Sequence, residues 1–333
     1  MPRVALLTVL LSLVWCATAS ADPQAYVVNA GSGSVSIIDT KTDEVSATFN
    51  VGDEPRGLAV TLAGERVYVS LDDGTIIERD MYAKAESGGT KLGQRTGAID
   101  LSPDGKLLAA VIEGQDDVVL LDLGMMRVVR KIPVRGGKGA ASAVFSPDGR
   151  LIYATAEQGP DVHVIDVRQR AVAGTIRVGV GSRSVAFLPD GSRAYIAADP
   201  ANEVVVIDVA RQAVLARVNT SGAPVALAPH PDRKRVFVIA AGKVEVLDAG
   251  ANRIVAEFET CNGASSLAVT PKGGKLYVAC PAANQVLAYD ASTYRRVAQV
   301  AVGGKPASVV VREPNPPAGG NDWEPRRGGP KPS

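Results

Sequence analysis

The sequence predicts an all-β fold built from seven similar units, and two observations carry this prediction. A strand that ends in aspartate recurs every 40 to 44 residues. Its seven copies end at Asp39, Asp80, Asp122, Asp166, Asp208, Asp248 and Asp290. Each unit is also rich in alternating Val and Ile and is interrupted every 6 to 10 residues by Gly, Pro, Asp or Asn, which favours short strands over helices. Four short strands in a repeat of this length are typical of a propeller blade, so we expect a seven-bladed β-propeller with four-stranded blades.

Each unit divides into four strands, which we name a to d in chain order. The a strands are predicted at residues 57–61, 97–101, 141–145, 184–187, 225–228, 265–269 and 307–311. A turn such as Ser146-Pro147-Asp148-Gly149 follows most of them, because proline presets the turn and glycine accepts the positive φ that ends it. The b strands are predicted at residues 25–28, 67–70, 151–154, 194–197, 236–239 and 276–280. The recurring aspartates end the c strands, where we expect them to accept hydrogen bonds from turn amides.

The two ends of the chain fall in different parts of a unit. The first repeat starts at a b strand, residues 25–28, and the last repeat stops after an a strand, residues 307–311. We therefore expect the C-terminal strand a to join the N-terminal strands b to d, so that one blade is built from both chain ends. This closure would remove the open seam of an array whose blades bury their faces mainly against their neighbours. The propeller domain is predicted over residues 22–313.

Residues 1–21 predict export. Arg3 precedes a small and apolar run over residues 4–19, and Ala19-Ser20-Ala21 forms a small-residue cleavage site. A run this short, with no charge cluster after it, is typical of a secretory signal peptide rather than of a membrane span. We expect cleavage after Ala21 and a periplasmic or secreted protein.

The composition changes after Glu313. Residues 314–333 are rich in Pro and Gly and show no periodic apolar face, so a flexible tail is predicted there. The tail contains Trp323, which is either a docking anchor or a tryptophan without a role.

Two cysteines remain once the predicted signal peptide, which contains Cys16, is removed. They are Cys261 and Cys280, an even pair in an oxidising compartment. A hairpin across residues 271–274 would bring both sulfurs to the same end of neighbouring strands. We expect a disulfide between them, and the alternative is two separate buried thiols.

The balance of charge excludes some partners. The chain has 36 Lys and Arg against 35 Asp and Glu, so it has no global field that favours nucleic acid or an anionic membrane. We expect a monomer with no nucleic acid partner and no membrane span.

Several short motifs carry a family resemblance over residues 25–311. The first repeat has Tyr26-Val27-Val28-Asn29, Ile38-Asp39 and Val51-Gly52, and a later one has Val206-Ile207-Asp208. In these motifs the chain resembles the YVTN-type seven-bladed propellers of secreted prokaryotic proteins, although Val28 stands where the family pattern has threonine. The resemblance implies the fold, while the family includes surface-layer, periplasmic binding and lactonase-like members.

One group within that family is similar in length, signal peptide and ending, here residues 306–312. It is a periplasmic group associated with PQQ-dependent alcohol oxidation and its transporter operons. This similarity implies an accessory role beside a quinoprotein oxidation or transport system. No cofactor of the chain itself is expected.

The axial mouth of the propeller is the expected site, because the loops from strand d to strand a and from strand b to strand c converge there. Five of the eight charged or amide residues in the predicted d-to-a loops are cationic: Arg56, Arg95, Lys138, Arg183 and Lys305. A mouth of this charge would attract a small anionic ligand or an acidic patch on a protein partner. The alternative is a solvated rim whose charges have no ligand.

Asp100 is the remaining candidate at the mouth. It stands where the other a strands have Ala or Val, so it can face the channel, either as a cation ligand or base or as a solvated carboxylate paired with Arg95. Metal binding is not predicted, because the two histidines, His163 and His230, are far apart in sequence and are expected at the surface. No motif of a catalytic nucleophile or a phosphate loop is present.

These observations lead to one expected function and one alternative. We expect a non-catalytic binding or scaffold propeller in the periplasm or outside the cell, with no catalytic residue assigned. The alternative is a lactonase-like hydrolase with its site at the propeller mouth. A lactonase would need convergent His, Glu and Asp side chains, and the loops contain few histidines.

Overall fold

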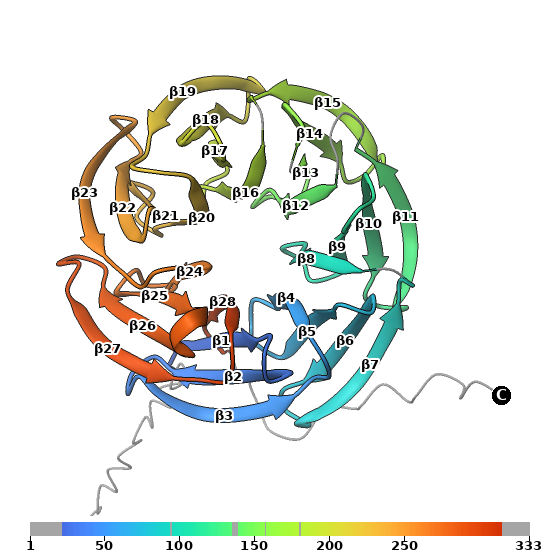
Figure 1. The fold of residues 1–333 in the computed structure, drawn as a ribbon. Coiled ribbons are helices and arrows are strands. Elements are labelled where there is room, and N and C mark those ends of the chain that lie inside the picture. The colour runs from blue at the N-terminus through green and yellow to red at the C-terminus, as the bar shows by residue number, and fades with distance from the viewer. Residues whose placement is uncertain (1–21, 94, 135–138, 157, 180, 315–333) are drawn as a thin grey trace, which may run out of the picture.

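The computed structural model describes residues 22–93, 95–134, 139–156, 158–179 and 181–314. Within these residues, 28 strands form seven four-stranded antiparallel sheets around a central axis (Figure 1). The prediction of an all-β, seven-bladed propeller is confirmed. The described part contains one short 3₁₀-helix, η1 (Pro281–Ala283), and none of its helices is long and apolar enough to cross a membrane.

Each blade runs from strand a at the axis to strand d at the rim. Blade 1 contains β28 (Pro306–Arg312), β1 (Gln24–Asn29), β2 (Ser34–Asp39) and β3 (Glu44–Asn50). Blade 2 contains β4 (Pro55–Val60), β5 (Arg66–Leu71), β6 (Thr75–Asp80) and β7 (Ala85–Lys91), and blade 3 contains β8 (Thr96–Leu101), β9 (Leu107–Ile112), β10 (Asp117–Asp122) and β11 (Arg127–Pro133). Blade 4 contains β12 (Ala140–Phe145), β13 (Leu151–Ala156), β14 (Asp161–Asp166) and β15 (Ala171–Arg177), and blade 5 contains β16 (Ser182–Phe187), β17 (Arg193–Ala198), β18 (Glu203–Asp208) and β19 (Ala213–Asn219). Blade 6 contains β20 (Pro224–Pro229), β21 (Arg235–Ala240), β22 (Lys243–Asp248) and β23 (Arg253–Glu259), and blade 7 contains β24 (Ser266–Val269), β25 (Lys275–Cys280), β26 (Gln285–Asp290) and β27 (Arg296–Ala301).

Blade 1 joins the two ends of the described chain. Strand β28 pairs antiparallel with β1, with Val309 opposite Val27 and Val311 opposite Ala25, and Figure 1 shows them side by side. The Arg312 guanidinium then reaches blade 2, where its Nε donates to the carbonyl oxygen of Val60 at 3.1 Å. The last strand therefore completes one blade and also contacts the next.

The core lies between the blades. Strands b and c are almost completely buried, whereas the d strands at the rim are mostly exposed. Five tyrosines occupy the same position of the b strands and are at most 1% exposed: Tyr26, Tyr68, Tyr153, Tyr195 and Tyr277. Because each buried face packs against the neighbouring blade, the blades stabilise one another around the ring.

The aspartates that end the c strands are structural. Each accepts a backbone N–H from the following turn, as Asp166 does from Gln169 at 2.7 Å and Asp248 does from Ala251 at 2.7 Å. The prediction that these aspartates accept hydrogen bonds from turn amides is confirmed.

Basic side chains at the start of three b strands tether one blade to the next. Arg193 and Arg235 donate to the carbonyl oxygens of Ala249 and Ala291 in the following blades. Lys275 donates to the carbonyl oxygen of Thr40 at 2.7 Å. These tethers lie at the end of the ring opposite the mouth, because strand b starts there.

The prediction that both histidines lie at the surface is wrong. His163 is 5% exposed and His230 is 6% exposed. In blade 6, Nδ1 of His230 accepts the backbone N–H of Asp232, and Nε2 lies 2.9 Å from the carbonyl oxygen of Gly273 in blade 7. The turn sequence alone does not predict this burial, because the neighbouring blade covers the imidazole ring.

Cys261 and Cys280 form a disulfide with their Cα atoms 5.9 Å apart. Strand β24 has 4 residues, whereas the a strands of blades 2 to 6 have 6. The disulfide links the loop before β24 to the end of β25. It therefore joins strands a and b of blade 7 where the backbone ladder of the other blades begins.

Candidate functional site

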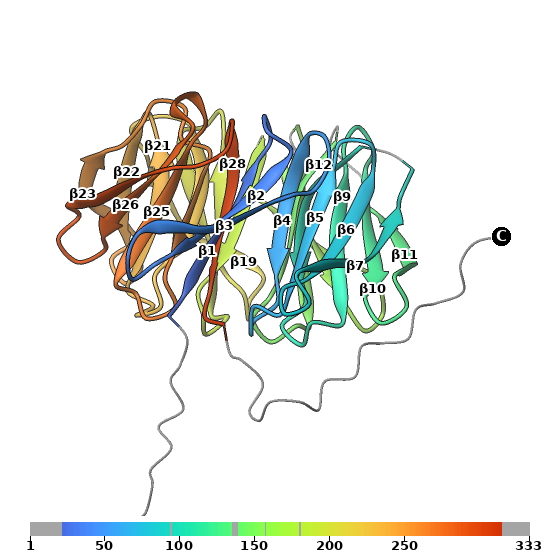
Figure 2. The same cartoon turned by 90° about the horizontal axis from the view of Figure 1, so that it is seen from below.

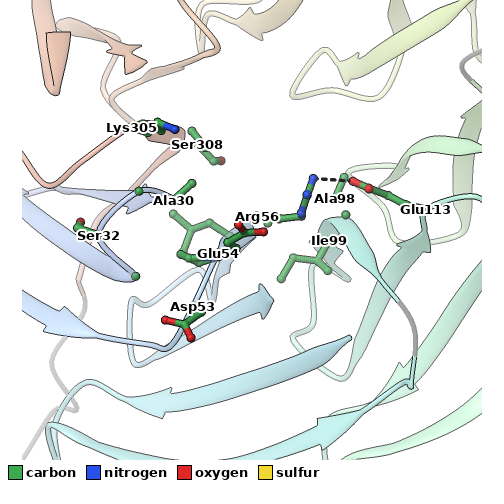
Figure 3. Close-up of a pocket in the computed structure, with 17 residues that line it drawn as sticks. Ala30, Ser32, Asp53, Glu54, Arg56, Ala98, Ile99, Glu113, Lys305 and Ser308 are labelled. Carbon is green, nitrogen blue, oxygen red and sulfur yellow. Dashed lines mark hydrogen bonds and ion pairs between the residues drawn. The ribbon is translucent and has the colours of Figure 1, made fainter. Parts of the chain in front are cut away.

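A cavity of about 1140 Å³ opens at the mouth of the propeller between blades 1, 2 and 3 (Figure 3). Its wall comes from the loop between β1 and β2, from the d-to-a loops that contain Asp53, Glu54 and Lys305, and from the first residues of β4 and β8. We call it the mouth cavity. The charged side chains of its lining are Asp53, Glu54, Arg56, Glu113 and Lys305.

Two of the predicted cations belong to an ion-pair network on one side of the mouth. Arg56 donates through Nε to Asp72 at 2.5 Å and through Nη1 to Glu113 at 3.1 Å, and the second contact is visible in Figure 3. Arg95 lies on the same two carboxylates, with Nε 2.6 Å from Asp72 and 3.4 Å from Glu113. The hydrogen bond from Arg95, together with that from Arg56, lowers the pKa of Asp72.

The mouth cavity is consequently not a purely cationic surface. Arg56 and Arg95 are compensated by two carboxylates, and the lining adds two more at Asp53 and Glu54. Lys305 makes no ion pair with the described residues, and neither do Asp53 and Glu54. One cation and two carboxylates that make no close ion pair therefore line the same cavity, with Glu54 near enough to Arg95 to act on its charge.

The backbone places Glu54 and Lys305 in equivalent positions on neighbouring blades. Each precedes a proline, and each has a positive φ, 46° for Glu54 and 51° for Lys305. This conformation is unfavourable for residues with a side chain, and the following proline restricts them further. Eleven other described non-glycine residues also have a positive φ, most of them in turns remote from the mouth, so this conformation is a feature of the turns and does not by itself indicate a functional site.

The other predicted cations lie apart from the mouth cavity. Arg183, the second residue of β16, pairs with Asp199 at 2.7 Å and does not line the cavity. Lys138 lies outside the described residues. Of the five predicted cations, Arg56, Arg95 and Lys305 are thus brought together at the mouth.

Asp100 does not pair with Arg95, contrary to the alternative considered for it. Its Oδ2 accepts the backbone N–H of Phe145 at 2.8 Å, which joins blade 3 to blade 4. Asp100 lies near the end of β8 that is remote from the mouth, and it does not line the mouth cavity. Burial raises its pKa to about 6, against the opposing influence of the Phe145 N–H and the Arg312 charge.

Asp72 and Glu113 were not predicted, because they belong to the b-to-c loops, whereas the cations were predicted in the d-to-a loops. Each directly follows a b strand, β5 or β9, and Asp199 follows β17 in the same way. The pairs Arg56–Asp72 and Arg183–Asp199 both link the second residue of strand a to the residue after strand b. An opposite charge at this repeated offset was a signal in the sequence that could have identified them.

The described residues contain no group of three or more His, Cys, Asp or Glu side chains that could hold a metal ion. The two histidines also lie away from the mouth cavity. The polar side chains that line the cavity are the carboxylates of Asp53, Glu54 and Glu113, the Arg56 guanidinium, the Lys305 ammonium group and the hydroxyls of Ser32 and Ser308.

The fold and the mouth define a seven-bladed propeller with a polar axial cavity. The model of the family "Lactonase, 7-bladed beta-propeller" matches residues 71–177, which cover parts of blades 2 to 4. A search of curated proteins found no match.

Solved structures with the same fold come from several kinds of protein. A chain of Kuenenia stuttgartiensis hydrazine synthase is 23% identical, with a TM-score of 0.71 over 80% of this chain and 92% of that one. A functionally unknown protein from Desulfotomaculum acetoxidans is 17% identical, with a TM-score of 0.79 over 88% and 99% of the two chains. The dihydro-heme d1 dehydrogenase NirN, in complex with DHE, is 17% identical, with a TM-score of 0.65 over 86% and 74%. At these identities the likeness shows the fold.

Proposed function

We propose that this protein is an exported, non-catalytic binding propeller whose mouth cavity takes a small carboxylate that also carries a hydroxyl or ammonium group. The observation that carries the proposal is the presence of unpaired charges of both signs in one cavity, Lys305 on one wall and Asp53 and Glu54 on another. A cavity of about 1140 Å³ is large enough for a small organic ligand.

Each group of such a ligand has a partner in the cavity. Its carboxylate would accept a charge-assisted hydrogen bond from Lys305. Its hydroxyl or ammonium group would donate to Glu54 or Asp53. The network of Arg56 with Asp72 and Glu113 would form a polar wall that is already satisfied, so it needs no reorganisation when the ligand binds.

Binding is tested by calorimetry of the purified protein with lactate, gluconate and glutamate as probes. We expect at least one of them to bind, and Lys305→Met to weaken that binding about tenfold or more, because a hydrogen bond between charged groups is lost. Lys131→Met, an exposed lysine on β11, is the matched control and should bind as the unchanged protein does. Failure of all three probes, or normal binding by Lys305→Met, would contradict the proposal.

The family match over residues 71–177 favours lactone hydrolysis as a second candidate, because this segment contains Asp72 and Glu113. In that case Glu54 would accept a proton from the water whose oxygen bonds to the lactone carbonyl carbon, and Arg56 would stabilise the negative charge on the carbonyl oxygen. The ring C–O bond would then break, and the protonated Glu54 would return its proton to the leaving alkoxide oxygen. The test is acid release from gluconolactone above the spontaneous rate. If the protein catalyses this release, and Glu54→Gln lowers the catalysed rate about a hundredfold or more, lactone hydrolysis replaces binding as the proposed function.

The cellular setting is part of the same proposal. The Cys261–Cys280 disulfide supports an oxidising compartment, and the resemblance to the PQQ-associated periplasmic group supports a role beside a quinoprotein oxidation or transport system. The position of the gene is the simplest check, since a quinoprotein dehydrogenase or its transporter encoded beside it would agree with this role.

The disulfide yields a prediction of its own. Thiol titration of exported protein, denatured without reductant, should find neither Cys261 nor Cys280 free. Replacement of both by serine should lower the free energy of unfolding by about 3 kcal/mol, because the unfolded chain loses a closed loop whose ends are 19 residues apart. Two reactive thiols in the exported protein would show that the bond does not form in the cell.

A further inference from the structure

A second cavity, of about 470 Å³, lies between blades 1 and 2. It opens among the start of β1, the strand β3, the end of β6 and the turn after β6. These segments lie at the end of the ring opposite the mouth. We call it the seam cavity, because it borders the blade that both chain ends build.

The seam cavity lies at a junction without the inter-blade tether that blades 5, 6 and 7 have. Blades 2, 3 and 4, which begin strand b with Arg66, Leu107 and Leu151, show no such tether either. Blades 5, 6 and 7 each begin strand b with Arg or Lys, which donates to a carbonyl oxygen of the next blade. Blade 1 has Gln24 at this position, and Met81 is the residue of blade 2 that would supply the carbonyl group. The Gln24 side chain instead accepts a hydrogen bond from the Tyr26 hydroxyl at 3.1 Å. Gln24 and Met81 therefore face the cavity without a bridge between them.

The wall of the seam cavity combines aromatic rings with a cation that lacks a counter-charge. The Arg79 guanidinium lies 4.3 Å from the centre of the Phe49 ring and donates through Nη2 to the carbonyl oxygen of Lys84 at 2.6 Å. Its Nε is buried without a hydrogen-bond partner, and no carboxylate of the described residues pairs with it. Tyr82, 43% exposed, also lines the cavity. A buried donor on a cation is costly unless an acceptor reaches it, and a carboxylate is the strongest acceptor available.

The described chain ends inside this cavity. Pro314 is part of its lining, and β28 ends at the same face of the ring, the lower one in Figure 2. The 19 residues that follow include Asp322-Trp323-Glu324, an aromatic residue between two carboxylates. The segment thus carries an aromatic ring that can pack on those of the wall, and the carboxylates that the wall lacks.

We propose that Asp322-Trp323-Glu324 of the same chain occupies the seam cavity. The indole ring packs against Phe49 and Tyr82, and one of the flanking carboxylates pairs with the accessible part of the Arg79 guanidinium. An aromatic anchor in a pocket beside a charged pair is a common arrangement at protein interfaces. Docking then covers the gap that Gln24 leaves and fixes the chain end across blades 1 and 2.

The connection is long enough for this return. Eight residues lie between Pro314 and Trp323, and the nine Cα-to-Cα steps of an extended chain span up to about 30 Å. Gly319 and Gly320 lie midway, where they permit a reversal of the chain. Because the segment is tethered beside its site, its effective concentration is of the order of millimolar, so a modest intrinsic affinity suffices.

Tryptophan fluorescence tests the proposal directly. The chain has two tryptophans, Trp15 and Trp323, so the full chain with Trp15→Phe reports only on the tail. We expect a blue-shifted emission and several-fold weaker acrylamide quenching than in the same chain unfolded in guanidinium chloride. Ala47→Phe, which fills the cavity from an exposed position of β3, and Arg79→Gln should both shift the emission to that of exposed tryptophan. Arg130→Gln, an exposed arginine of β11, should leave the emission unchanged.

Three outcomes would overturn the proposal. An emission equal to that of the unfolded chain would show that Trp323 is not buried. A blue-shifted emission that neither Ala47→Phe nor Arg79→Gln changes would show that Trp323 is buried at another site. A blue shift that disappears on dilution would mean that the tail of a second copy, rather than the same chain, occupies the cavity.

Discussion

A chain that ends at Lys305 is expected to lose cooperative folding. This truncation removes β28, and with it the pairing to β1 and the burial of Val309 and Val311, each 3% exposed. Each of these side chains contributes about 1.5 to 3 kcal/mol when buried, and the ring also opens along the edge of β1. The combined loss is comparable to the whole stability of a typical domain, about 5 to 15 kcal/mol.

Circular dichroism during thermal unfolding measures this effect. The matched control is a chain that ends at Pro314, which keeps all 28 described strands and should unfold in one cooperative transition. If the chain that ends at Lys305 unfolds cooperatively within a few degrees of this control, closure by β28 does not determine stability.

Asp100→Asn is expected to stabilise the protein at neutral pH. Burial raises the pKa of Asp100 from 3.8 to about 6 on folding, so the folded chain holds this proton more tightly than the unfolded chain does. The free energy of unfolding therefore falls as pH rises from about 4 to about 6. Two pKa units correspond to up to about 3 kcal/mol, and the partial exposure of the residue reduces this figure by screening. The amide of Asn keeps an oxygen to accept the Phe145 N–H without the charge.

Denaturant unfolding at two pH values separates this effect from a general one. At pH 7.5 Asp100→Asn should exceed the unchanged protein in stability, and at pH 4 the difference should vanish because the carboxyl group is then protonated. Glu86→Gln removes the same charge from an exposed position of β7 and should show no such pH dependence. A stabilisation of equal size at both pH values would exclude the titration of Asp100 as its cause.

The repeat was sufficient to predict the fold, but strand limits depended on pairing that the sequence does not show. The first a strand was predicted to start at residue 57, whereas β4 starts at Pro55, which lies opposite Leu71. Proline lacks the N–H that marks a ladder residue, yet the first position of a strand tolerates it. In blade 7 the difference has the opposite sign: β24 starts at Ser266, one residue later than the predicted start at residue 265.

The candidate site was predicted only in part, because its charges are compensated by residues from other loops. Arg56 and Lys305 were identified as mouth residues, but the neutralisation of Arg56 by Asp72 and Glu113 changes what the cavity can bind. Asp100 stood out correctly as an exception among the a strands, while its environment depends on Phe145 of the next blade and Arg312 of blade 1. No spacing in the sequence brings residues 100 and 312 together without the closed ring.

The closure of blade 1 also determines when the protein can fold. Among the described strands β28 is the last to be synthesised, so β1 has no partner on that side until all the other described strands have been made. Domains generally fold as units during synthesis, but here the first-made strands cannot finish their sheet before the last is present. Closure of the ring is therefore expected late in folding, after the last of the described strands has been made.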